Sequence, residues 1–484
     1  MVVRGGAGIF YDRVGEDRVV HAFEQGYPYA ATYDFGFGSP RWAQSTLAVP
    51  YPAISLVCLP SDPNCNSEPN GLGFAPRFAD PATANNSFPF GFQTNSGLNT
   101  PLDPTSVHIP LVREYSLGVQ YEFLPQWVLE VGYVGSSGIN LTDYNHNHNG
   151  ATLFSPCGAA DITGACASDP LGICTGTTMA NAICNTSNNA NFRVPVLGYE
   201  AIGLESSDND GASNYNSLQV TVRHQFARGL SMQAAYTWDK DLSDVFFGNS
   251  ANINNALCLR CQWGRVSFDR PQRFVVNYSY DLPFGKGTEG ITNKLIAGWN
   301  VSGVTIAQGG DPLTIIDSGI PGVSAGAGAA YGTNTSLSFQ GVATAQFCSG
   351  FNNSNVKNPG GIHENLGSYI NPNAFNSVTC PAPIVPFGDP TAETYGNSGV
   401  GIVLGPGQFN WDISILKNTQ ITEKIKMQFR SDFYNAFNHT QFADPGSGGF
   451  GGVGFEDITS PTYNQITHVS VNPRLVQFGL HFIF

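Results

Sequence analysis

Charged residues are scarce in this sequence of 484 residues, at 12% of the chain. Basic residues are the scarcer kind, with 22 against 36 acidic ones, and the formal net charge is −14. A chain without a basic field does not attract phosphates, so nucleic acid is excluded as a partner. Long apolar runs are missing as well. The longest, around residues 47–59, is broken by Pro50 and Pro52, so the sequence predicts no transmembrane helix.

A signal peptide is also missing from the start of the sequence. Residues 1–6 lack the charged region and the apolar region that such a peptide needs, and residues 3–11 already alternate like a strand. Because other features below indicate export, we expect the chain to be the C-terminal portion of a longer protein.

Glycine and aromatic residues are abundant, with 56 glycines and 12% aromatics. This composition suits long strands joined by polar loops. The last segment shows the pattern most clearly, because an apolar, aromatic-rich face alternates with Gln477, Gly479 and His481. Strict period-two alternation predicts a half-buried strand. An apolar strand at the end of a chain invites aggregation in a soluble domain, whereas a membrane barrel turns such a face toward lipid.

Similar segments recur along the whole chain. Tyr115, Leu117 and Val119, for example, share one face of a segment whose other face is polar. The pattern predicts strands near residues 3–11, 113–123, 127–135, 214–226, 230–240, 271–281, 294–316, 408–419, 425–438 and 473–484.

The connections between these segments alternate between short and long. Short turns join the middle eight segments into four hairpins, and much longer loops span 136–213, 241–270, 317–407 and 439–471. Outer-membrane barrels have short periplasmic turns and long external loops. The sequence therefore predicts an all-β fold, an antiparallel transmembrane β-barrel portion of about ten strands with short periplasmic turns and long extracellular loops. A soluble β-sandwich or propeller is the competing interpretation.

Several of these segments carry charged side chains on the face opposite to the apolar one. A basic residue facing lipid near the midplane would cost about 2–4 kcal/mol, so we assign the charged face to the side away from lipid. We expect this face to line a wet or plugged lumen. The lumen-facing polar candidates are Glu122, Glu130, Arg273, Arg430 and Asp432.

The ten cysteines lie in loops and in even groups, which favours loop-local disulfides in an oxidising compartment. The four in the loop 136–213 allow three connectivities. The disulfide candidates are Cys58, Cys65, Cys157, Cys166, Cys174, Cys184, Cys258, Cys261, Cys348 and Cys380.

Three short motifs admit a chemical interpretation. Cys258 and Cys261 have the spacing of a redox or zinc motif, but a loop disulfide is favoured. His146 and His148 could ligate a metal and residues 208–211 resemble a calcium loop, yet neither has a complete ligand set, and a turn is favoured for 208–211. No nucleophile elbow or other catalytic constellation is present. We therefore expect no enzyme activity, no metal and no cofactor.

Four segments carry a family resemblance. They are residues 215–244 (YNSLQVTVRHQFARGLSMQAAYTWDKDLSD), 269–287 (DRPQRFVVNYSYDLPFGKG), 4–13 and 429–442. They resemble segments of the Oar-like TonB-dependent receptors of the outer membrane. The resemblance implies the last ten strands of a larger barrel in the cell outer membrane, with the plug, the TonB box and the N-terminal regulatory-like domain missing from this sequence.

The resemblance also implies partners. These are outer-membrane lipid, the barrel-assembly machinery, an unknown solute or surface partner, and the TonB system only through the missing N-terminal part. The end of the chain resembles the signal that the assembly machinery reads. The residues that match this signal are Gln477, Gly479, Phe482 and Phe484.

Two functions remain open on the sequence. The first is a receptor or transporter barrel that moves or binds a bulky solute. The alternative is an adhesion-type surface protein whose long cysteine-bearing loops bind a partner. A small self-closed barrel of ten strands is a third architecture.

Overall fold

A computed structural model gives the fold. It describes residues 1–12, 98–100, 108–148, 204–227, 229–245, 258–285, 287–317, 343–375, 396–446, 455–458 and 460–483.

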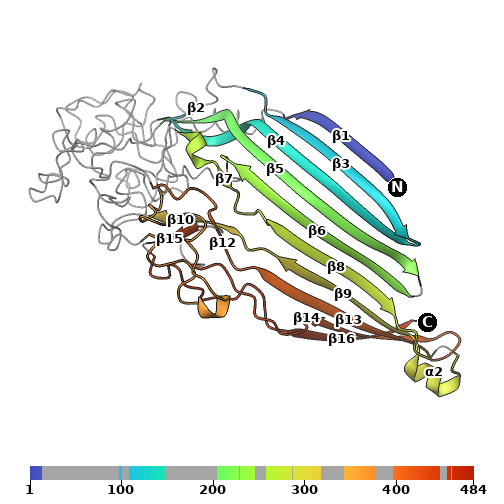
Figure 1. The fold of residues 1–484 in the computed structure, drawn as a ribbon. Helices are drawn as coiled ribbons and strands as arrows, with labels where there is room; N and C mark the ends of the chain where they lie inside the picture. The colour runs from blue at the N-terminus through green and yellow to red at the C-terminus, as the bar shows by residue number, and fades with distance from the viewer. Residues whose placement is uncertain are drawn as a thin grey trace, which may run out of the picture.

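One large antiparallel sheet dominates the structure (Figure 1). Its strands run in the order β1-β3-β4-β5-β6-β8-β9-β13-β14-β16, and two short strands, β2 and β7, pair with β5 and β6. The main strands are β1 (Val2–Tyr11), β3 (Leu111–Leu124), β4 (Trp127–Asn147), β5 (Leu204–Ala227), β6 (Leu230–Ser243), β8 (Gln272–Asp281), β9 (Trp299–Gln308), β13 (Gln408–Gln420), β14 (Lys426–Tyr434) and β16 (Leu475–Ile483). The short strands are β2 (Leu98–Thr100) and β7 (Gly264–Arg265). The predicted all-β, antiparallel architecture is confirmed.

The short connections all lie at one end of the sheet, together with both chain termini (Figure 1). The turn between β5 and β6 is tight because Gly229 adopts a φ of +89°, and a Cβ there would lie 2.8 Å from the backbone oxygen of Asp281. The strand ends that the long connections join lie at the opposite end. The predicted asymmetry of short periplasmic turns and long external loops is confirmed.

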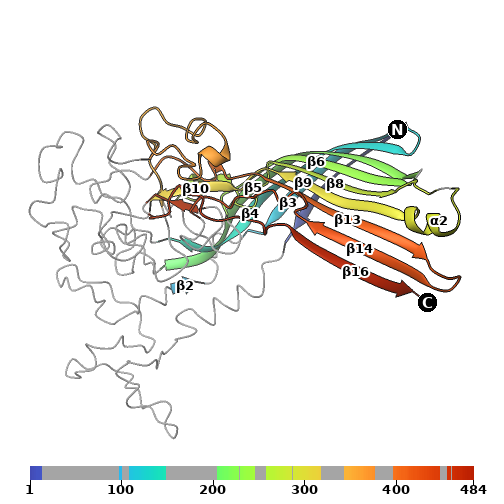
Figure 2. The same cartoon turned by 90° about the horizontal axis from the view of Figure 1, so that it is seen from below.

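The sheet is curled but not closed (Figure 2). Within the described residues β1 pairs only with β3 and β16 only with β14. The first and last strands therefore each present an unpaired edge. In the described ranges every helix falls short of the length and apolarity that a bilayer crossing requires.

The prediction of one strand over residues 294–316 is wrong. The connection after β8 contains the helix α2 (Gly290–Ile296), and Gly298 has a φ of +76°, which turns the chain from the helix into β9. After β9 the chain leaves the sheet at Gly309 and Gly310 and forms β10 (Pro312–Asp317) elsewhere. The apolar residues of α2 and β10 resemble the strand pattern, so alternation alone did not separate the three elements.

Two predicted strands are too short. β4 extends to Asn147 and β5 begins at Leu204, so this hairpin reaches well beyond the predicted ends at residues 135 and 214. The predicted turn at residues 208–211 is also wrong, because these residues lie within β5 opposite the end of β4. Register shifts between Ile139 and His146 mark this extension, where the sequence no longer alternates.

The external end carries a folded unit that the sequence analysis described only as loops. We call it the external cap and define it as residues 309–317, 343–375, 396–407 and 439–470 of the described chain. It contains a small sheet of β10, β11 (Ala343–Thr344), β12 (Val403–Leu404) and β15 (Phe455–Asp457), and a turn of 3-10 helix at Ile362–Glu364. Its core is made of Leu313, Ile315, Ala345, Phe347, Val356, Tyr369, Ile370, Ala374, Phe375, Val403 and Ile466.

Candidate functional site: the polar inner face of the sheet

Cross-strand pairing assigns every residue of the large sheet to one of two faces, because directly opposed residues share a face. Glu130 lies opposite Gln120 and Thr221, and the same face continues through each pair to β16. We call it the inner face. It carries all the polar candidates named from the sequence, Glu122, Glu130, Arg273, Arg430 and Asp432.

The other face, which we call the outer face, carries most of the large apolar side chains that the sheet exposes. Phe478 is 67% exposed and Leu117 57% exposed, although both sit within strands. In water such a surface would be an aggregation site, whereas in a bilayer it is the surface that lipid covers. Its exposed members are Val3, Ile9, Tyr11, Tyr115, Leu117, Tyr121, Phe123, Val131, Tyr133, Leu218, Trp238, Phe274, Phe409, Val476, Phe478, Leu480 and Phe482.

Aromatic side chains gather at both ends of the outer face. Near the external end, the hydroxyl groups of Tyr115 and Tyr133 both donate to Asn216 Oδ1, at 3.3 and 2.6 Å. Near the turn end, Trp127 lies 4.5 Å from the ring of His224. Amphipathic rings at two levels on either side of an apolar band are the girdles of a membrane barrel.

A row of serines crosses the inner face near the end of the sheet that carries the tight turns. Ser231, Ser279, Ser302 and Ser414 lie on the successive strands β6, β8, β9 and β13, each directly opposite the next. The row continues into Asp432 of β14. Four hydroxyls in register form a hydrogen-bonding strip without fixed charge. The row is not predictable from the sequence, because alternation gives the face of each serine but not its level along the sheet.

The serine row lies in a hollow of about 630 Å³ on the sheet. Two guanidinium groups and two carboxylates line it, from Arg223, Arg430, Asp412 and Asp432. Arg430 Nε donates to Asp432 Oδ1 at 2.8 Å, so this pair is mutually neutralised. Arg223 makes no ion pair with any described residue. Amide and hydroxyl groups also line it at Gln233, Asn277, Ser279, Ser302 and Ser414, and apolar residues such as Val304 contribute to the lining as well.

Several polar groups in and beside the hollow are hydrogen-bonded to one another. Asp412 Oδ1 accepts from Asn410 Nδ2 at 3.0 Å and from the Asn435 backbone N–H at 2.9 Å. Just outside the row, Asn300 Nδ2 donates to Ser279 Oγ at 3.0 Å and to Asp281 Oδ1 at 2.8 Å. Such a surface can hydrogen-bond a hydrated, polar molecule.

The predicted assembly signal falls on the last strand. Gln477 and Gly479 lie on the inner face of β16 and Phe482 on its outer face, while Phe484 lies outside the described residues. That these residues are read during assembly stays a prediction.

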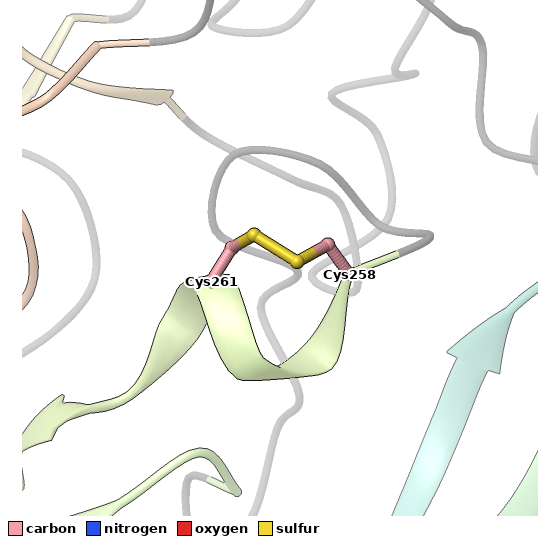
Figure 3. The surroundings of a disulfide bond; sticks show 2 residues. All are labelled: Cys258 and Cys261. Carbon is pink, nitrogen blue, oxygen red and sulfur yellow. A yellow bond between two sulfur atoms is a disulfide. The ribbon is translucent and has the colours of Figure 1, made fainter.

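Among the cysteines, Cys258 and Cys261 are joined in a disulfide that closes one turn of 3-10 helix, Leu259–Gln262 (Figure 3). This turn precedes β7, which pairs with the external end of β6. Cys348 in the external cap is also disulfide-bonded. The remaining candidates, Cys58, Cys65, Cys157, Cys166, Cys174, Cys184 and Cys380, lie outside the described residues.

The two motifs considered as metal sites meet on the extended β4–β5 hairpin. His148 Nε2 lies 3.0 Å from Asp208 Oδ2. Across the described ranges no three side chains of the metal-ligating types gather in one place. His148 and Asp208 therefore form a histidine–carboxylate pair.

The segment 258–270, which we call the rim segment, packs against residues 396–407 of the external cap. A Cβ on Gly401 would lie 2.6 Å from the backbone oxygen of Arg265, so the two backbones are in direct contact. Arg270 forms an ion pair with Asp311 at the start of the external cap. It also acts electrostatically on Asp444, in the cap segment 439–470. The Arg270 guanidinium thus links the rim segment to two segments of the external cap, at Asp311 and at Asp444.

Asp444 gives this connection a pH dependence. Burial raises the pKa of its carboxyl from 3.8 to about 6, although Arg270 acts in the opposite direction. Because the folded state holds the proton more tightly than the unfolded chain, we expect stability to be greatest below pH 3.8. It should fall as the pH rises to about 6 and change little above that value.

The test is the free energy of unfolding of the cap between pH 3.5 and pH 7, roughly the window of this shift. Asp444→Asn should flatten the profile. Burial also raises the pKa of Asp244 and Asp269, so some slope of the same sign should remain. Glu364→Gln removes an exposed carboxylate of the cap and serves as the control. An Asp444→Asn profile as steep as that of the parent chain would contradict this assignment.

An apolar outer face between aromatic girdles, a polar inner face and tight turns at one end together define the wall of an outer-membrane β-barrel. The chain belongs to the outer membrane beta barrel domain family, whose sequence model matches residues 1–477. The predicted fold class and the location in the cell outer membrane are thereby confirmed.

Solved structures similar to this chain are transporters and receptors of the outer membrane. The outer membrane transporter YddB from Escherichia coli aligns with a TM-score of 0.35 and 10% identity over 81% of this chain. The ferripyoverdine receptor of Pseudomonas aeruginosa aligns with a TM-score of 0.29 and 12% identity over 78% of this chain. The ferric-catecholate import receptor Fiu from E. coli K12 aligns with a TM-score of 0.31 and 9% identity over 86% of this chain. This chain covers 35%, 27% and 31% of those chains, respectively. No curated protein sequence gives a significant match.

Proposed function

We propose that the chain forms the C-terminal part of the wall of a TonB-dependent-receptor-type barrel, and that this barrel moves or binds a bulky polar solute. The serine row and its hollow carry the proposal. They put a hydrogen-bonding surface on the face opposite to the lipid-facing one. Energy from the TonB system would enter through an N-terminal part of the whole protein, and no enzymatic step is invoked.

The size and chemistry of the hollow support this function. A volume of about 630 Å³ is within the range of small-molecule sites, roughly 300–1,000 Å³. Its hydroxyl and amide groups can exchange hydrogen bonds with a passing solute one after another. Arg223 adds one positive charge that no described carboxylate neutralises, which favours solutes with an acceptor-rich or anionic surface.

The experiment compares solute depletion from a complex growth medium by mass spectrometry. The strains carry the intact gene, a deletion, or the double variant Ser302→Leu/Ser414→Leu, which makes the serine row apolar. The control is Val301→Leu/Ile415→Leu, which changes the same two strands on the outer face. We expect the deletion strain and the serine variant to leave the same polar solute in the medium, and the control strain to deplete it normally.

The adhesion alternative gives a different result in the same strains. Loss of adhesion by the deletion strain, with every solute depleted at the normal rate, would contradict transport and favour a surface-interaction protein. Normal depletion by the serine variant, with loss only in the deletion strain, would show that the inner face is not the solute path.

A further inference from the structure

The turn between β8 and β9 differs from the other three tight turns because it contains the helix α2. This helix lies at the periplasmic end of the sheet, beside the turn between β13 and β14 (Figures 1 and 2). It is too short to contribute to the barrel wall, and all of its residues except Asn293 are exposed.

Three hydrogen bonds place α2 on the outer side of the sheet. Trp299 Nε1 donates to the Leu295 carbonyl oxygen at 3.3 Å, and Thr419 Oγ1 donates to that of Lys294 at 3.5 Å. Lys417 Nζ donates to the carbonyl oxygen of Ala297, directly after the helix. Trp299, Lys417 and Thr419 all belong to the outer face by register. The helix is therefore held against the lipid-facing surface and not against the lumen.

The side chains of α2 divide into two groups. Asn293 faces the protein, where its Nδ2 donates to the Gly285 carbonyl oxygen at 3.2 Å. Ile291 and Leu295, one turn apart, are 77% and 66% exposed. Ile296 is exposed next to them, so the free side of the helix is apolar apart from Thr292. An apolar helix side that the protein leaves uncovered, beside a surface that lipid covers, indicates the same solvent for both.

We propose that α2 is an interfacial foot, which lies in the headgroup region of the periplasmic leaflet and inserts Ile291 and Leu295 among the acyl chains of its phospholipids. The apolar outer face continues to the base of the helix, so one lipid-covered surface includes both. Trp299 has the amphipathic ring that prefers this level of a bilayer. Lys294, whose Nζ donates to the Ile421 carbonyl oxygen at 3.0 Å, places a positive charge where lipid phosphates lie.

The foot has a structural consequence for the barrel. It fixes the depth of β8, β9 and β13 at the periplasmic surface, because moving the strands outward would pull two apolar side chains through the headgroups. The proposal depends on the membrane-spanning sheet alone and not on which solute the barrel carries.

The first test measures contact with lipid directly. An environment-sensitive fluorescent residue is placed by stop-codon suppression at position 291, 295 or 423, and the full chain is refolded into phosphatidylcholine vesicles with brominated acyl chains. Glu423 is the control, because it is exposed in the neighbouring β13–β14 turn and is polar. We expect quenching at 291 and 295 to exceed that at 423 by at least about twofold, since bromine quenches only at contact range. Equal quenching at all three positions would overturn the proposal.

The second test keeps the helix and changes only its affinity for lipid. Leu295→Asp and Thr422→Asp add the same charge to α2 and to the neighbouring β13–β14 turn, at the same end of the sheet. We expect Leu295→Asp to lower the fraction of chain that inserts into vesicles several-fold, and Thr422→Asp to leave it close to that of the parent chain. Insertion of Leu295→Asp at the level of Thr422→Asp would count against the foot, whatever the fluorescence of the parent helix.

Discussion

Replacing Tyr369 by alanine is expected to unfold the external cap while the sheet stays in the membrane. Tyr369 is 1% exposed at the centre of the cap core, and its hydroxyl group donates to the Leu404 carbonyl oxygen at 2.8 Å. Lys357 Nζ lies above its ring at 4.3 Å and donates to its hydroxyl oxygen at 2.5 Å. Removing a fully buried aromatic side chain costs about 3–5 kcal/mol. A unit of this size is rarely more stable than about 5–15 kcal/mol.

Hydrogen exchange of the cap amides and protease cleavage on intact cells would measure this effect. The matched control is Tyr369→Phe, which keeps the ring and loses the hydroxyl group, so its cost should be nearer 1–3 kcal/mol, roughly that of one buried group left without its partner. Faster exchange across the cap in Tyr369→Ala, with unchanged exchange in β5 and β6, is the expected pattern. Equal exchange in the two variants would show that the cap does not depend on this core.

Replacing Val220 by arginine is expected to be the most damaging single change in the large sheet. Val220 lies in β5 on the outer face, opposite Val131 and Tyr236, so the new charge would point into lipid. An arginine facing lipid near the midplane of a barrel costs about 2–4 kcal/mol. The same substitution at Thr221 points into the polar inner face and should cost less than about 1 kcal/mol, because water or polar groups solvate it.

The two variants differ by one position in one strand, so strand propensity and chain charge are matched. Denaturant unfolding in phospholipid vesicles would give the two free energies, and the heat-dependent shift of the folded band in gel electrophoresis gives a second readout. A larger loss for Thr221→Arg than for Val220→Arg would reverse the assignment of the two faces.

Local alternation located the strands that cross the bilayer, although it ran β9 together with α2 and β10. Each strand there meets lipid on one side and polar groups on the other, so its sequence must alternate with period two. Outside the bilayer no face of a strand has to meet lipid, so the pattern disappears. This is why the β4 extension, with residues such as Asn145 and Asn147, and the start of β5 read as loop.

The external cap could not be predicted, because its core is assembled from segments far apart in the chain. Leu313, Phe347, Tyr369 and Ile466 meet in one cluster although more than 150 positions separate the first from the last, and no period connects them. The helix α2 was missed for a related reason. A helix of 7 residues, about two turns, is too short to distinguish a helical period from alternation.

The candidate site shows the same division between local and long-range information. The sequence assigns Ser302 and Ser414 to the inner face of their strands, but their meeting in one row depends on the register between β9 and β13. That register is set by a connection of about a hundred residues, most of it the external cap, and no local signal encodes it. The rim contact of Arg270 with Asp311 likewise depends on how the cap sits on the sheet.

The measurement that tests the account most directly is the lipid and water accessibility along β5. A nitroxide-bearing residue is placed in turn at positions 218 to 223 of the chain in phospholipid vesicles. Its collision rates with oxygen, which concentrates in lipid, and with a polar nickel chelate are then recorded. The two-faced wall predicts high oxygen accessibility at Leu218, Val220 and Val222, and high chelate accessibility at Gln219, Thr221 and Arg223. Accessibilities without this alternation, or with the two sets exchanged, would contradict a membrane wall with a lipid-facing apolar side and a polar inner side.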